Sequence, residues 1–211
     1  MDGLTLIVIM ITFYDDIRYP HLNPAITLSS CLTLDTKIIL GLGLIFVQFF
    51  GAFFGALLTR AVMKSSAFIN TFVSLGLLTR NLEFRPEDDS EVFANRFQMF
   101  LMETILTFML TFSHTMISQE NQEIYLPINV GVARAITAYI GLHSFSQSVN
   151  LARMLANNII AAIFALDDHV WRFFYIFVFA AIVGPVFSAG FFWLLRYSRM
   201  DRAHERTTIE N

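Results

Sequence analysis

Cysteine and charged residues are scarce in this chain. Its single cysteine, Cys31, excludes a disulfide within the chain, and we interpret it as a small packing residue. Only 15% of the residues are Asp, Glu, Lys or Arg, against about 25% in soluble domains. The chain also has no Asn-x-Ser/Thr site, so N-glycosylation is not expected.

The patterns that mark enzymes and nucleic-acid binders are missing as well. The five histidines are scattered, so they predict no metal site. There is no nucleophile paired with a base, no glycine-rich phosphate loop and no basic patch interleaved with aromatic residues. The sequence therefore predicts no enzyme, no cofactor and no nucleic-acid partner.

Apolar residues are abundant and indicate a membrane protein. They make up 55% of the chain, with 23 phenylalanines and a mean hydropathy of +0.59. We expect about five spans, of which the first is shorter than the ~20 residues needed to cross a bilayer. They are residues 3–14, 38–59, 97–118, 125–143 and 173–195.

Two short stretches predict the starts of half-helices. Both read Asn-x-Ala and precede mostly apolar runs, expected to be helical over about 24–33 and 151–163. Asn is a strong N-cap, and Pro is tolerated at the first helical position. We expect the two N-termini to meet at the bilayer midplane. The residues concerned are Asn23, Pro24, Ala25, Asn150, Leu151 and Ala152.

These stretches carry a family resemblance. His-x-Asn-Pro-Ala-Ile-Thr-Leu, paired with Asn-x-Ala-Arg, resembles the aquaporin (major intrinsic protein) family, although Leu151 stands where the family usually has Pro. The stretch from Gln48 to Ala56 is similar to the third helix of that family. Its Gly51 and Gly55 either form a close-packing face or are simply tolerated in a membrane helix.

The predicted fold is an all-α membrane protein, an aquaporin-like inverted-repeat bundle with two re-entrant half-helices. The second half reads span, span, half-helix, span, and the first reads short span, half-helix, span. Because inverted repeats carry equal numbers of helices, we expect the first half to lack its opening span. The predicted parts are one transmembrane domain over 1–196 (half-repeats 1–60 and 97–196, loop 61–96) and a tail over 197–211.

The paired half-helices suggest how a pore would work. Each N-terminus carries about half a positive charge, so two of them oppose the entry of cations and protons. The amides of Asn23 and Asn150 would donate hydrogen bonds to passing water. The alternative is that the two asparagines only cap helices.

The resemblance also implies an outer constriction. It places Arg153 there, with Gln147, Ala138 and Gly3 as the other positions. Gly3 and Ala138 are small, which implies a wide constriction that admits solutes such as glycerol or urea.

Two further charged side chains, Glu103 and Arg134, lie within the predicted spans and are candidates for a role in the channel. Glu103 resembles the fourth-helix Glu of the family, and with Thr107 we interpret it as structural support for the loop before the second half-helix. Arg134 lies one turn before Ala138, so it either faces the pore or extends to the near interface.

The predicted function is passive permeation of water, with small neutral solutes as further candidates. The alternative is a non-conducting truncated subunit that assembles with full-length aquaporins, and a secondary transporter is a third idea. The resemblance implies a homotetramer. We expect a multi-pass protein of the plasma membrane or an intracellular membrane, with the arginine-rich tail in the cytoplasm.

Overall fold

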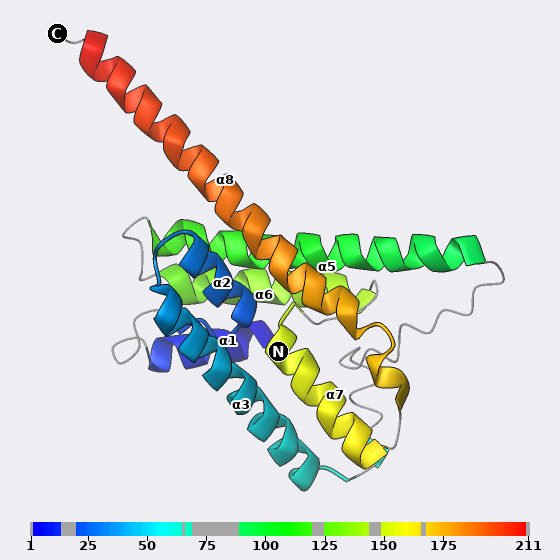
Figure 1. Cartoon of the computed structure of the whole chain (residues 1–211). Coiled ribbons are helices and arrows are strands. Elements are labelled where there is room, and N and C mark those ends of the chain that lie inside the picture. Colours follow the sequence, from blue (N-terminus) through cyan, green and yellow to red (C-terminus); the bar gives the residue numbers. More distant parts are fainter. Residues whose placement is uncertain are drawn as a thin grey trace.

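The computed structural model describes residues 2–13, 20–64, 66–68, 89–119, 125–143, 149–165 and 168–209. Within these ranges the regular structure is helical, as the composition and apolar runs predicted (Figure 1). The elements are α1 (Asp2–Thr12), α2 (Pro24–Leu32), α3 (Ile38–Val62), α5 (Asp89–Ser118), α6 (Leu126–His143), α7 (Leu151–Ala165), the 3-10 turn η3 (Asp168–Trp171) and α8 (Phe174–Ile209).

Among the described residues, three helices are long and apolar enough to cross a membrane. They are Ile38–Val62, Arg96–Ser118 and Phe174–Met200. Helix α6 has 18 residues, but Asn129 and Arg134 make it more polar. Helices α1 and α7 are apolar and shorter. The five predicted runs are therefore all helical in the described residues, and three of them reach the length and hydropathy of a span.

The helix ends differ from the predictions in two places: α5 begins at Asp89, inside the predicted loop 61–96, and α8 runs beyond its predicted end. Both half-helices begin where expected, at Pro24 and Leu151. Helix α8, in contrast, continues through residues predicted as a tail and ends at Ile209. Residues 197–209 contain no Gly or Pro to end a helix. In Figure 1 this part of α8 projects away from the bundle.

The helix contacts follow an inverted repeat. Half-helix α2, from the first half, packs against α8, the last helix of the second half. Half-helix α7, from the second half, packs against α3, the last helix of the first half. Helices α1 and α6, which precede the half-helices, pack against each other. With this exchange of partners, α2 and α7 meet near their N-terminal ends (Figure 1).

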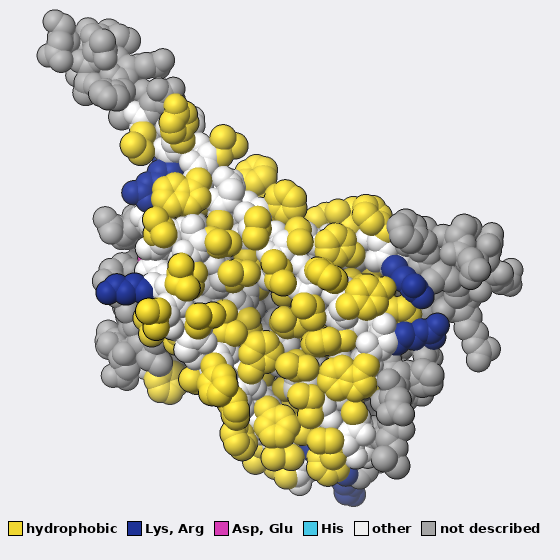
Figure 2. Space-filling view, viewed as in Figure 1, with side chains coloured by type: hydrophobic (Ala, Val, Ile, Leu, Met, Phe, Trp, Pro, Cys, Tyr) yellow, Lys and Arg dark blue, Asp and Glu magenta, His cyan; other side chains and the backbone are white. Residues whose placement is uncertain are grey.

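The outer surface is apolar. Figure 2 shows hydrophobic side chains over much of the described part of one face. Only 6% of the apolar 18-residue stretch of α3 is buried within the chain. A Cβ atom added at Gly51 or Gly55 would meet nothing within 4 Å. These glycines therefore form no close helix contact with the part of the chain that the structure describes, and the apolar surface suits contact with lipid.

Candidate functional site

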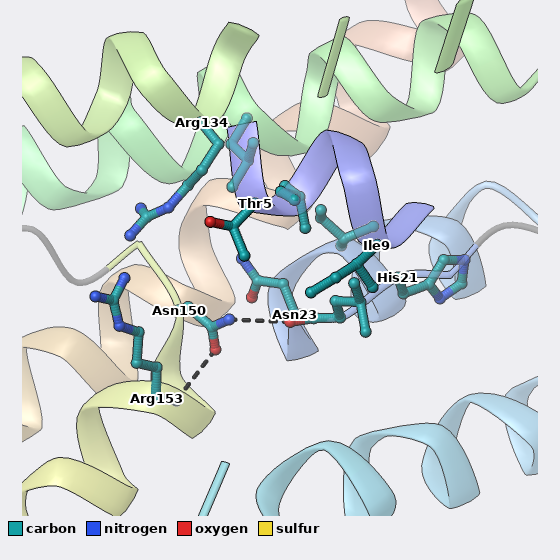
Figure 3. Close-up of a pocket in the computed structure, with 11 residues that line it drawn as sticks. Thr5, Ile9, His21, Asn23, Arg134, Asn150 and Arg153 are labelled. Atoms are coloured by element: carbon teal, nitrogen blue, oxygen red, sulfur yellow. Dashed lines mark hydrogen bonds between the residues drawn. The ribbon is translucent and has the colours of Figure 1, made fainter. Parts of the chain in front are cut away.

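The two half-helix starts are joined by a reciprocal pair of hydrogen bonds. Asn23 Oδ1 accepts from the Ala25 amide at 3.0 Å and caps α2, while its Nδ2 donates to the Val149 carbonyl at 2.7 Å. Asn150 Oδ1 accepts from the Arg153 amide at 3.2 Å and caps α7, while its Nδ2 donates to the Leu22 carbonyl at 3.0 Å (Figure 3). Each asparagine thus caps its own helix and holds the chain entering the other.

The residue before each asparagine has a left-handed backbone. Leu22 has φ 49° and Val149 has φ 42°. Such values are uncommon for residues other than glycine, and a β-branched residue there is an outlier. The carbonyls of both residues accept the bonds from the opposite asparagine. The matched conformations show that the two halves share one local structure at this point.

Glu103 of α5 binds the backbone of Val149, the second of these two left-handed residues. Its Oε1 accepts from the Val149 amide at 2.5 Å, and its side chain is buried. One turn later on α5, Thr107 lies against Gly184 of α8. The peptide groups on both sides of Val149 are therefore fixed: its amide by Glu103 and its carbonyl by Asn23.

A cavity of about 350 Å³ opens beside the paired asparagines. Its walls come from α1, α2, α5, α6, α7 and the segment that leads into α2. It combines polar groups from both half-helices with apolar side chains. The lining residues are Thr5, Leu6, Ile9, His21, Leu22, Asn23, Ile26, Leu110, Arg134, Asn150 and Arg153.

Comparison with known families decides the assignment. Residues 3–192 match the model of the family described as Major intrinsic protein, which is most of the 211-residue chain. The chain belongs to the major intrinsic protein family. No match was found among curated proteins. The protein is thus a multi-pass membrane channel of the major intrinsic protein family, as the two Asn-x-Ala stretches suggested.

Only some of the residues that the family resemblance placed in the constriction reach the cavity. Arg153 lines it. Gly3 is instead buried where α1 crosses α6. The contact is so close that a Cβ atom at this position would collide with Gly131 and Ala135. Ala138 is half-buried on α6 and is not part of the cavity wall. Gln147 lies outside the described residues.

The side chain of Arg134 lines the cavity beside the paired asparagines. Its side chain is only 6% exposed, and it shares the cavity wall with Arg153. In Figure 3 the two side chains point toward one another, Arg134 from α6 and Arg153 from α7. Of the two orientations that the sequence left open, the structure has the cavity-facing one.

Sequence reasoning placed Gly3 of α1 at the constriction and missed the residues of α1 that line the cavity. Thr5 and Ile9 lie four residues apart, on one face of that helix, and both line the cavity. Their spacing was the only available signal. It is weak, because α1 is apolar on nearly every side and no periodic polar face singles out the two residues.

A second polar layer anchors α2 to its neighbours. Thr27 Oγ1 accepts from Gln48 Nε2 of α3 at 2.9 Å and lies 3.2 Å from His21 Nδ1. The His21 ring meets the His114 ring of α5 edge to face, with centroids 5.3 Å apart. Further along α2, Ser29 bonds Thr115 of α5 at 2.8 Å. These contacts fix the half-helix whose N-terminus carries Asn23.

Proposed function

We propose that this chain is a water channel whose path passes the amides of Asn23 and Asn150. The observation that carries the proposal is that both amides, from opposite half-helices, line one cavity. An asparagine amide has two N–H donors, and each Nδ2 donates to a carbonyl of the opposite half. This pairing holds the amides where water in the cavity can accept from them.

The rest of the wall supports passage of neutral molecules. Leu6, Ile9 and Leu110 offer water no hydrogen-bond partner. Water can therefore hydrogen-bond only to the polar part of the wall, which includes the two amides, while the positive ends of α2 and α7 oppose cations and protons. A cavity of about 350 Å³ is also large enough for glycerol or urea, which we propose as further solutes.

The first test is Asn23→Asp. The change replaces the donor to the Val149 carbonyl by an acceptor and adds a negative charge to a side chain that is 4% exposed. We expect the osmotic permeability of vesicles containing the variant to fall to nearly that of empty vesicles, measured by stopped-flow light scattering. Asn129→Asp is the matched control, because Asn129 lies on α6 outside the cavity wall and should leave permeability unchanged.

Two outcomes would count against the proposal. If vesicles with the natural sequence shrink no faster than empty vesicles, the chain does not conduct water. If Asn23→Asp conducts as well as the natural sequence, the path does not pass Asn23. Equal amounts of folded protein in each vesicle preparation, checked by size-exclusion chromatography, make these readings comparable.

The second candidate function is a non-conducting subunit, and Arg134 favours it. A long guanidinium side chain in the cavity reduces the space available to water. We therefore expect Arg134→Val to raise osmotic permeability several-fold in the same assay, while Arg172→Val, at an exposed position before α8, leaves it unchanged. Permeation that appears only in Arg134→Val would assign the natural chain the non-conducting role. Unchanged permeability would show that Arg134 does not narrow the path.

Assembly and orientation are further parts of the proposal. The apolar outer face of α3, with Gly51 and Gly55 open, suits either lipid or a neighbouring subunit of a homotetramer. The arginines of the chain's last residues favour a cytoplasmic C-terminal end, in the plasma membrane or an intracellular membrane.

A further inference from the structure

We infer that a groove between α5 and α8 binds one phospholipid molecule, with an acyl chain in the groove and the lipid phosphate at Arg96. The groove shares no lining residue with the cavity beside the paired asparagines, so lipid binding there does not depend on water permeation. A lipid at such a site differs from the lipid that covers the rest of the outer surface, because its binding saturates and depends on particular side chains.

The shape and surface of the groove suit an acyl chain. It has a volume of about 430 Å³ and lies between two helices that pack against each other (Figure 1). Most of its wall is apolar. The side chains are Arg96, Phe97 and Phe100 of α5 and Tyr175, Phe179 and Val183 of α8. A chain in a concave groove contacts more protein atoms than a chain on a flat face, and each contact adds dispersion attraction.

The groove begins at the expected membrane boundary. The apolar spans of α5 and α8 start at Arg96 and Phe174, and side chains from the starts of both spans line the groove. Trp171 contacts Phe174 edge to face, with ring centroids 5.5 Å apart, and Tyr175 follows in the groove wall. Trp and Tyr are enriched at the level of the lipid headgroups. A lipid at this boundary therefore places its headgroup near Arg96 and its chains along the rest of the groove.

The side chain of Arg96 supplies the contact for the phosphate. Its guanidinium carbon lies 5.4 Å from the centre of the Phe173 ring, which is 6% exposed. Within the described part of the chain, its buried Nε atom has no hydrogen-bond acceptor. A phosphate oxygen is a strong acceptor for the N–H groups of a guanidinium. Phosphatidylcholine and phosphatidylglycerol share the phosphodiester group, so this contact requires no particular net charge of the lipid.

The test follows thermal unfolding of the full chain in detergent micelles while one lipid is titrated in. We expect phosphatidylcholine and phosphatidylglycerol to raise the unfolding midpoint saturably. A diacylglycerol with the same acyl chains should bind about tenfold more weakly, because it lacks the phosphate. Arg96→Gln should weaken both phospholipids to nearly the level of the diacylglycerol. Arg60→Gln is the matched control and should keep the natural affinity, because Arg60 also contacts phenylalanine rings but lies outside the groove.

Val183→Trp keeps the test decisive if Arg96→Gln does not fold. The larger side chain fills part of the groove, so we expect the phospholipids and the diacylglycerol to lose affinity several-fold. Ile182→Trp, at a 47% exposed position outside the groove, should bind them as the natural chain does. Unchanged phospholipid affinity in Arg96→Gln or in Val183→Trp, or equal stabilisation by the diacylglycerol, would overturn the inference. Binding of phosphatidylglycerol alone would overturn it too, because the net charge of the lipid would then be recognised instead of its phosphate.

Discussion

Replacing Glu103 by alanine is expected to lower the free energy of unfolding by about 3 kcal/mol, because the change leaves a buried amide without its acceptor. That amide belongs to Val149, which Glu103 Oε1 binds at 2.5 Å. Both groups are buried, since Glu103 is 4% exposed and Val149 is 2% exposed. Water does not readily take the place of the lost carboxylate there.

The same change should reduce permeation as well as stability. Val149 has a left-handed backbone, which the surroundings must hold in place. Its carbonyl accepts from Asn23, and the next residue, Asn150, caps α7. A loosened Val149 would therefore misplace both asparagines of the proposed path, and osmotic permeability should fall together with the midpoint of thermal unfolding.

Glu103→Gln is the matched variant. Its side-chain oxygen can still accept from the Val149 amide, so we expect a loss of only about 1 kcal/mol and most of the permeability retained. Thermal unfolding in detergent and vesicle shrinkage measure the two effects. If alanine and glutamine variants lose the same stability, the hydrogen bond to Val149 is not the source of the effect.

Gly184→Ala is expected to destabilise the packing of α8 on α5 by about 1–3 kcal/mol, because the added methyl overpacks the contact. A Cβ at this position would lie 2.8 Å from Thr107 Cβ and 3.0 Å from the Phe108 amide nitrogen. These are atoms near or in the backbone of α5, so a simple side-chain rotation cannot relieve the contact. The midpoint of thermal unfolding measures the loss.

Gly190→Ala, six residues later on the same helix, separates packing from helix propensity. A Cβ there would meet nothing within 4 Å. Alanine favours the helical state by up to about 1 kcal/mol over glycine, so this variant should be neutral or slightly stabilised. Equal destabilisation at both positions would contradict the close α5–α8 contact.

Much of the local structure at the site was predictable, because it depends on neighbours in sequence. Asn23 followed by Pro24 predicts a capped helix start, and α2 begins at Pro24. The second start lacks proline, but Asn150 still caps α7, which begins at Leu151. A missing proline removes only a preset φ, and it costs no hydrogen bond at the first helical position.

The left-handed residues could not be predicted. Glycine is the usual signal for a positive φ, and this chain has Leu22 and Val149 at those positions. Their conformation is imposed from outside, by the opposite asparagine on each carbonyl and by Glu103 on the Val149 amide. These partners are more than forty residues away in the chain, so local sequence preferences carry no trace of them.

The membrane class, the two half-helix starts and, through the motifs around them, membership in the major intrinsic protein family could all be inferred from the amino-acid sequence. Hydropathy and helix capping depend on composition and on residues a few positions apart, which a sequence displays directly. The packed structure was needed to show that Arg134 and Arg153 line one cavity and that Gly3 packs against Gly131. Which side chains share a cavity depends on how each helix is rotated against its neighbours, and in helices that are apolar on nearly every side no polar face reveals that rotation.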